Sequence, residues 1–527
     1  MTRPRPTTRV ARGVTYLFVQ GLASSVIGLV YFVFLVGLLS QEEMGVYTLL
    51  TFTLNLVALF GNFALPAAAT KYISQFLAEG NLEKAKSVVN RLLRVWLLSS
   101  AICFVSLFLP AELLSKLMFD SPNYTIHFML LSLCVVFMIL NVFMQNSLRG
   151  LQKIGDFALT GFLYAVFHSV LGLVLLFAGL GLLAVVLSWL VGLVVSSLTG
   201  LFLTMKNLGL TRKPHPLRPL INFSYPLYVS NIISFLATWV DSILIFSYVS
   251  VVIGPIRAQE LLGIYYVAVR ASLIPMLFST AIITALLPQL SELYTREGLS
   301  SLKDAFRVST RYLALIGFPM IIGLATLSSP IIVIFAGQEY AAAALPLTII
   351  CFSVIPTTLG VAINPILLTL ERTKIVSLIT VLSIFFNIVA SFVTLAYLNL
   401  GLPGPAVART FSTIITLALS AMALKGIFSL KFDSEALRKA AFSSLLMIMA
   451  IFLLEVVRRI VMPSPNQFLV ITLPILILYI VVGAATYFLS LVALKTIKKY
   501  DIEMLHDYLP KGFKWVAAWL SRLAHLE

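Results

Sequence analysis

The sequence predicts an all-α polytopic membrane protein with about fourteen transmembrane helices, arranged as two pseudo-symmetric six-helix lobes plus two C-terminal helices. Of its 527 residues, 60% are hydrophobic and only 11% are charged, whereas soluble domains carry about 25% charged residues. The mean hydropathy is +1.01. Apolar runs of helical length recur along the chain, and an internal repeat relates its two halves. Together these observations predict the fold class.

Apolar runs long enough to cross a bilayer follow one another through almost the whole chain. About 20 apolar residues span the hydrocarbon core as a helix. The first run follows a basic segment and is too long for a cleavable signal peptide, so we interpret it as a retained span. The predicted spans are residues 13–39, 45–69, 92–116, 126–148, 157–178, 181–205, 220–249, 261–287, 312–336, 341–369, 374–398, 402–424, 440–461 and 468–494.

The basic residues lie mainly on one side of the predicted membrane. With the N-terminus in the cytoplasm, only Lys116, Arg257, Arg458 and Arg459 lie on the outer side, and two arginines lie inside spans. All other Lys and Arg residues then lie in cytoplasmic segments, which is the positive-inside pattern. This topology explains the net charge of +16. We therefore expect a multi-pass protein of the cell (plasma) membrane with both termini in the cytoplasm and no nucleic-acid partner.

The two halves of the sequence resemble each other. Gly45-Val46-Tyr47 matches Gly263-Ile264-Tyr265 at an offset of 218 residues, and Glu79-Gly80 matches Glu297-Gly298 at the same offset. Six spans separate the copies, an even number, so both copies have the same orientation. This is a parallel repeat, an arrangement in which two helical lobes rock around a site near the midplane.

The repeat and the charge pattern divide the chain into five predicted parts. Segments 71–91 and 289–311 mix charges with spaced apolar residues and are expected to be amphipathic helices at the membrane surface. The tail has the same character, and its alternative is a helix packed on the cytoplasmic ends of the spans. The parts are an N-terminal lobe (1–205, spans 1–6), a basic cytoplasmic linker (206–219), a C-terminal lobe (220–424, spans 7–12), two additional spans (425–494) and a cytoplasmic amphipathic tail (495–527).

Three charged residues lie inside predicted spans. Asp241 and Arg270 lie on consecutive spans, each roughly 12–13 Å from the outer end, and Arg409 lies roughly 10 Å in. An ionisable residue inside a membrane is costly and indicates a functional site. We interpret Arg270 and Arg409 as substrate-binding residues, because arginine presents a planar fork suited to phosphate oxygens. Asp241 is the candidate counter-ion or coupling residue.

These charges also have structural interpretations, which the sequence leaves open. Asp241 and Arg270 would form a buried ion pair that joins two helices, and Arg409 would extend toward the outer interface. In the first lobe, Phe52 occupies the position equivalent to Arg270. The functional interpretation is therefore a water-filled cavity between lobes with its charge on the second lobe.

Uncharged polar residues inside spans are further candidates to line this cavity. Their alternative role is hydrogen bonding between helices, which is the usual role of such residues in membranes. The candidates are Gln20, Asn55, Asn62, Asn141, Gln145 and Asn231.

Sequence motifs of common enzymes are absent. The chain contains no GxxxxGK[ST] phosphate loop, no HExxH, no zinc-type spacing of Cys and His, and no GxSxG elbow. Its three cysteines, Cys103, Cys134 and Cys351, lie inside apolar runs and indicate neither a disulfide framework nor a metal site. We therefore expect no catalytic residues, no metal and no cofactor, and a protein that is not an enzyme.

Several loose motifs occur in a specific order along the chain: Gly45-Val46-Tyr47, LINFSYPLYVSN leading to Asp241, GIYYVAVR through Pro288-Gln289-Leu290-Ser291-Glu292, PMIIGLATLSSPIIVIFAGQEYAAAALP and KKYDIEMLHDYLP. They resemble those of the multidrug/oligosaccharidyl-lipid/polysaccharide (MOP) exporter superfamily. They are most similar to its polysaccharide-transporter branch, the O-antigen-type flippases. The pattern Tyr-x-x-Ala-x-Arg, which ends at Arg270, also resembles the lipid II flippases, where an Arg at this position belongs to the central cavity. This chain departs from that group because its first lobe lacks further cavity arginines.

The resemblance implies an alternating-access flippase that moves a polyprenyl-phosphate- or polyprenyl-diphosphate-linked oligosaccharide from the inner to the outer leaflet. It implies a lipid-linked oligosaccharide and the bilayer as partners, with glycan-assembly enzymes as further candidates and a monomer as the functional form. One alternative is a cation-coupled multidrug exporter of the same superfamily, which would favour carboxylates in its cavity. The other is a non-transporting membrane scaffold for glycan assembly, which would tolerate loss of Arg270 and Arg409.

Overall fold

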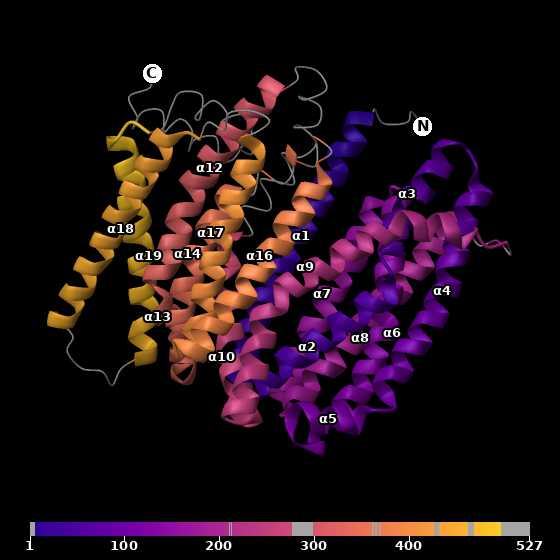
Figure 1. Ribbon diagram of the computed structural model, residues 1–527, viewed down its shortest axis with the longest axis horizontal. Helices are drawn as coiled ribbons and strands as arrows, with labels where there is room; N and C mark the ends of the chain where they lie inside the picture. Colours follow the sequence, from indigo (N-terminus) through magenta and orange to yellow (C-terminus); the bar gives the residue numbers. More distant parts are fainter. Residues whose placement is uncertain are drawn as a thin grey trace. The chain divides into compact units, whose positions relative to one another are not determined.

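A computed structural model shows a helical membrane protein (Figure 1). The structure describes residues 6–209, 211, 213–276, 299–360, 363, 366–367, 370, 372–425, 432–461 and 468–496. Within this part of the chain there is no strand, and 13 helices are long and apolar enough to cross a membrane. The predicted all-α polytopic fold is confirmed. The predicted span 261–287 begins inside one further helix, and its residues from 277 onward lie outside the described residues.

Contacts between Cα atoms divide the chain into two compact units, Met1–Tyr266 and Val267–Glu527. The predicted domain boundaries follow the repeat instead, and they stay predictions. The tail from 497 onward lies outside the described residues. The helices that begin in the first unit are α1 (Pro6–Leu38), α2 (Gln41–Asn62), α3 (Leu65–Ala78), α4 (Leu82–Phe108), α5 (Ala111–Phe119), η1 (Pro122–Tyr124), α6 (Thr125–Gly150), α7 (Ile154–Phe177), α8 (Gly181–Leu208), α9 (Leu217–Val252) and α10 (Pro255–Ser272).

The second unit repeats the succession of helices found in the first. A long helix, a helix of 9 residues, a 3-10 turn and then long helices occur in this order in both units. This order supports the duplication that the sequence predicts. The helices of the second unit are α12 (Leu299–Thr326), α13 (Ser328–Ala336), η2 (Gln338–Ala343), α14 (Ala344–Gly360), α16 (Thr373–Phe392), the π-helix η3 (Val393–Tyr397), α17 (Pro403–Lys425), α18 (Ser434–Val461) and α19 (Phe468–Ala493).

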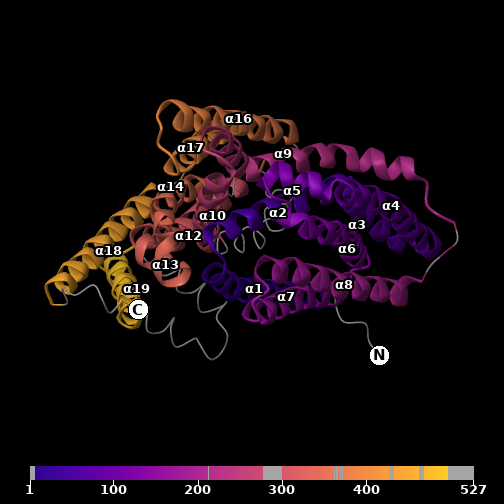
Figure 2. The same ribbon diagram turned by 90° about the horizontal axis from the view of Figure 1, so that it is seen from below.

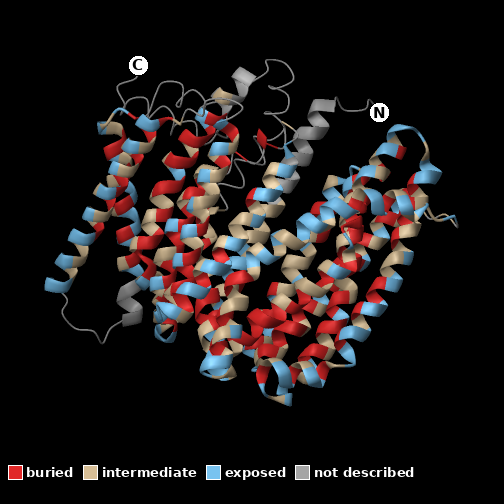
Figure 3. Cartoon of the chain, viewed as in Figure 1, coloured by how far each residue is buried: buried red, intermediate tan, exposed pale blue. Residues whose placement is uncertain are grey.

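Helix α6 forms the centre of the first unit. It packs against α2, α3, α4 and α8, and Phe128, Leu131, Ile139 and Phe143 on it are fully buried. Figure 3 shows buried residues concentrated where these helices meet. Helix α1 packs along α7, whereas α9 packs along α3 (Figure 2). Helix α9 therefore presents one side to α2 and α3.

The predicted span 45–69 is divided into two helices. The side chain of Ser40 accepts a hydrogen bond from Glu43 N (3.2 Å) and its backbone N donates to Glu43 (2.9 Å), so a capping box starts α2. Phe63 and Ala64 both have left-handed backbone conformations (φ 48° and 52°), which ends α2. Pro66 lies in the first turn of α3, a position that suits proline.

The prediction of one surface helix over 71–91 is wrong. Helix α3 ends at Ala78, Gly80 adopts a left-handed conformation (φ 72°), and Asn81 caps α4 by accepting a hydrogen bond from Lys84 N. Residues 82–91 are therefore the first turns of a membrane helix. In the second copy, residues 299–311 likewise begin α12, and 289–298 lie outside the described residues.

Apolar packing and a buried ion pair hold the C-terminal helix pair of the second unit. Met447, Ile451, Leu476 and Tyr487 of α18 and α19 form a core cluster with Leu327. Arg311 of α12 donates to Asp433 (3.1 Å) and to the carbonyl of Thr496 (2.6 Å). Asp433 also accepts from Ala436 N and so caps α18. The side chains of Arg311 and Asp433 are 8% and 6% exposed.

Helices α2 and α10 touch backbone to backbone through glycines related by the repeat. A Cβ added at Gly45 would collide with the carbonyl group of Gln259, and one added at Gly263 would collide with the carbonyl oxygen of Gln41. Gly45 and Gly263 are 218 residues apart, as are Gln41 and Gln259. The contact is therefore reciprocal, as at a two-fold axis. Small residues at such crossings allow close approach of membrane helices.

We expect Gly45→Ala and Gly263→Ala each to destabilise the protein, because the added methyl group has no space at the crossing of α2 and α10. Overpacking costs about 1–3 kcal/mol. The measurement is the midpoint of thermal denaturation in detergent. Gly37→Ala is the control, since a Cβ there meets nothing within 4 Å and alanine favours helix. Equal denaturation midpoints for all three variants would contradict the close approach of the α2 and α10 backbones.

We expect Asp433→Asn to destabilise the protein by about 3–5 kcal/mol, because it removes the charge of the buried carboxylate to which the Arg311 guanidinium donates. Denaturation in detergent provides the measurement. Glu435→Gln is the matched control on the same helix, because the pair of Glu435 with Lys439 is surface-exposed on the Glu435 side (61%) and such pairs contribute about 0–1 kcal/mol. A control variant as unstable as Asp433→Asn would disprove the special role of the buried pair.

Candidate functional site

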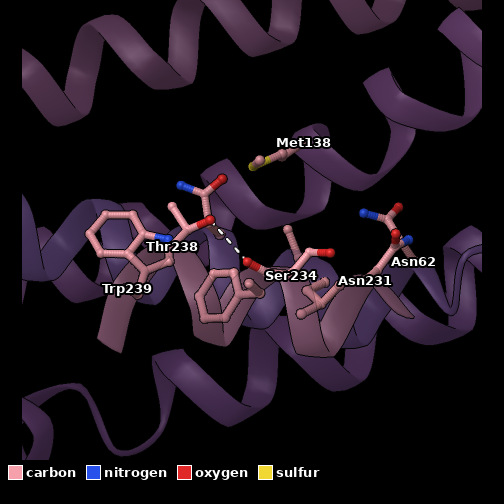
Figure 4. Close-up of a pocket in the computed structure, with 10 residues that line it drawn as sticks. Asn62, Met138, Asn231, Ser234, Thr238 and Trp239 are labelled. Atoms are coloured by element: carbon pink, nitrogen blue, oxygen red, sulfur yellow. Dashed lines mark hydrogen bonds between the residues drawn. The ribbon is translucent and has the colours of Figure 1, made fainter. Parts of the chain in front are cut away.

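A groove between α2 and α9 is the candidate site of the first unit (Figure 4). Its volume is about 350 Å³. Helix α2 contributes Asn55 and Asn62, two turns apart, and α6 contributes Met138. Helix α9 contributes five residues at spacings that place them on one face. The lining residues are Asn55, Ala58, Leu59, Asn62, Met138, Asn231, Ser234, Phe235, Thr238 and Trp239.

The polar side chains of the groove use only part of their hydrogen-bonding capacity within their own helices. Asn55 Nδ2 donates to Thr51 O (2.7 Å), Ser234 Oγ to Ser230 O (2.9 Å) and Thr238 Oγ1 to Ser234 O (2.9 Å). Both hydroxyl donors and one of the two N–H donors of Asn55 are thus satisfied, while the side-chain oxygens remain acceptors. Asn62 Oδ1 is buried and has no hydrogen-bond partner among the described residues.

Aromatic rings support one end of the groove. The ring centroid of Trp239 lies 5.5 Å from that of Phe52, 6.2 Å from that of Phe235 and 6.4 Å from that of Tyr266. Tyr47 continues the cluster, with its ring 5.8 Å from that of Tyr266. Figure 4 places Trp239 at one end of the row of labelled α9 side chains and Asn231 toward the other.

Asp241 lies two residues beyond Trp239, on the side of α9 that is packed inside the first unit. It is 3% exposed, and its Oδ2 accepts a hydrogen bond from the hydroxyl of Tyr265 (3.1 Å), which is fully buried. The crossing of α2 and α10 at Gly263 positions Tyr265, because it lies two residues further along α10. The sequence identified Tyr265 as part of the repeat but did not identify it as the partner of Asp241.

The structure separates the six predicted cavity residues into two groups. Asn55, Asn62 and Asn231 line the groove together. Asn141 is buried between helices and accepts a hydrogen bond from Ser196 (3.0 Å), while Gln20 donates to Ser24 (3.1 Å) within its own helix. Gln145 is partly buried on α6. None of these last three residues is among those that line the groove.

The two predicted substrate arginines belong to the second unit. Arg270 lies near the end of α10 and is exposed, and Arg409 lies in the second turn of α17 and is partly buried. The next residue, Thr410, donates to Ile349 O of α14 (3.0 Å), so α14 fixes this turn of α17. The roles of Arg270, Arg409 and Asp241 stay predictions.

The family model described as "Polysaccharide biosynthesis protein" matches residues 34–345, more than half of the chain. A protein of Haloferax volcanii named "Probable low-salt glycan biosynthesis flippase Agl15" is 26% identical over 452 residues, which cover 84% of this chain and 89% of that protein.

Two solved structures share the fold. The lipid II flippase MurJ in an inward closed conformation has a TM-score of 0.69 and 18% sequence identity, covering 90% of this chain and 98% of that chain. An inward-facing multidrug resistance MATE family transporter of the MOP superfamily has a TM-score of 0.66 and 14% identity, covering 77% of this chain and 95% of that chain. The chain therefore belongs to the family described as polysaccharide biosynthesis protein.

Proposed function

We propose that this protein is a flippase that moves a lipid-linked oligosaccharide or polysaccharide repeat unit across the cell membrane, from the inner to the outer leaflet. The observation that carries the proposal is the similarity to a protein named as a glycan biosynthesis flippase, which extends over 84% of this chain. The uncharged polar groove of the first unit adds to it, because a sugar carries hydroxyl groups that need hydrogen-bonding partners.

The proposed substrate has a polyprenyl phosphate or diphosphate carrier. Arg270 and Arg409 are the residues we propose to bind its phosphate, since a guanidinium binds phosphate oxygens through two parallel hydrogen bonds. The head group would pass through the protein by alternating access of the two lobes while the lipid tail stays in the bilayer. In this proposal the protein works as a monomer with both termini in the cytoplasm and catalyses no covalent reaction.

The first test is a flipping assay with the purified chain in proteoliposomes and a labelled polyprenyl-diphosphate oligosaccharide. We expect Arg270→Ala to slow flipping by about ten- to a hundredfold, the loss of one or two charge-assisted hydrogen bonds. Arg257→Ala is the control, because Arg257 is exposed and donates to Glu260 three residues away.

The outcomes of this assay separate the candidate functions. Flipping at the wild-type rate by Arg270→Ala would disprove phosphate binding by Arg270 and assign it a structural role. It would not contradict the proposed flippase function. Absence of flipping by the wild-type chain, together with efflux of a cationic dye, would instead support a multidrug exporter, whose fold this chain shares.

We further propose Asp241 as the coupling residue, and we expect Asp241→Asn to abolish the response of flipping to an imposed ion gradient or membrane potential. Asparagine keeps an acceptor for the Tyr265 hydroxyl but removes the charge. Tyr265→Phe is the matched variant, because it removes the hydrogen bond and leaves the charge. An unchanged response in Asp241→Asn would eliminate this role.

A further inference from the structure

We propose that the groove between α2 and α9 is a binding site for neutral, hydroxyl-rich sugar rings of the transported glycan. This inference rests on the proposed flippase function and deepens it, because it assigns the glycan portion of the substrate to named residues. Phosphate recognition is assigned above to the arginines of the second unit, so the two portions of the substrate would have different binding residues.

The lining of the groove determines the class of ligand. None of its ten residues is charged, and they include three carboxamides and two hydroxyl groups. A charged ligand would lose its hydration here without gaining a counter-charge, which is costly. A purely apolar ligand would leave the carboxamides unpaired. A neutral polyol fits both conditions, because each hydroxyl group donates and accepts, as each carboxamide does.

Asn62 provides the most specific observation. Its Oδ1 is buried and lacks a hydrogen-bond partner in the part of the chain that the structure describes. Such a group is expensive in a membrane segment, where no bulk water replaces the missing bond. The terminal torsion of asparagine is broad, so the carboxamide can turn toward a donor in the groove. Figure 4 shows Asn231 near Asn62 at this end of the groove.

The aromatic end complements the amide end. The apolar C–H face of a sugar ring packs against an aromatic face through dispersion and burial of apolar surface. The rings of Phe52, Phe235 and Tyr266 pack around Trp239, with centroids within 6.4 Å of its own. They fix the orientation of the indole ring against which the sugar would pack. Residues 231 to 239 extend about 12 Å along α9, which is longer than a single sugar ring.

An aromatic cluster also suits an organic cation, and the position of Asp241 argues against that ligand here. Asp241 is the carboxylate nearest in sequence to Trp239, yet it is 3% exposed, accepts a hydrogen bond from Tyr265 and is not a lining residue of the groove. A cation in the groove would therefore lack a carboxylate among the lining residues.

The test compares the binding of two labelled lipids by the full chain in detergent: a polyprenyl diphosphate carrying a neutral oligosaccharide and the same lipid without sugar. We expect Asn62→Leu, Asn231→Leu and Trp239→Leu each to weaken binding of the glycosylated lipid by about three- to tenfold and to leave binding of the sugar-free lipid unchanged. Asn231 is exposed, so its variant tests the groove even where a buried change disturbs folding.

Ser247→Leu is the control on the same helix, because Ser247 is exposed, donates to the carbonyl of Ile243 on its own helix and lies two turns beyond Trp239. We expect it to bind both lipids as the wild-type chain does. A loss of affinity in Ser247→Leu equal to that in Asn231→Leu would overturn the sugar site, since apolar substitution anywhere on α9 would then have the same effect.

The remaining outcomes separate this inference from the proposed function. A wild-type preference for the glycosylated lipid that survives in all three groove variants would overturn the sugar site and leave the flippase intact. Equal binding of both lipids by the wild-type chain would also overturn the sugar site. The flippase function would then be tested by the flipping assay alone. Binding of neither lipid, with no flipping, would overturn both. Binding of a cationic dye that Trp239→Leu abolishes, without sugar binding, would assign the groove to cations.

Discussion

The site geometry of the first unit depends on the close approach of α2 and α10. Gly45 and Gly263 have no Cβ, so each backbone lies directly against a carbonyl group of the other helix. This approach sets Tyr265 against Asp241 and the following residue, Tyr266, against Trp239. A side chain at either glycine would push α10 away from α2, and the aromatic end of the groove and the hydrogen bond to Asp241 would change together. Packing at one crossing therefore positions both features.

Inside a membrane, every polar group must find a partner within the protein. Many serines and threonines of the described helices donate to a carbonyl one turn earlier, as Thr48 and Thr51 do, and Asn141 accepts a hydrogen bond from Ser196. The groove gathers carboxamides and hydroxyl groups along one open volume, and Asn62 Oδ1 there is one of several buried polar atoms without a hydrogen-bond partner among the described residues.

The duplication gave the two copies different chemistry at one equivalent position. Arg270 corresponds to Phe52 at the repeat offset, and Phe52 packs against Phe235 and Trp239 beside the groove. An arginine at this position would place a charge beside an uncharged groove. An aromatic residue instead extends the apolar wall, which agrees with a division between sugar recognition on the first unit and phosphate recognition on the second.

Composition, apolar run length and charge distribution by themselves determined the fold class and nearly all membrane spans, because crossing a bilayer requires long apolar helices. The internal repeat was equally visible in the sequence. Local backbone geometry decided the break at Phe63, which an unbroken apolar run does not reveal. Only the tertiary structure decided which asparagines share a site. Asn55, Asn62 and Asn141 look alike in sequence, but helix rotation and packing direct the first two into the groove and the third toward Ser196. Rotation depends on contacts between distant segments, so no local pattern specifies it.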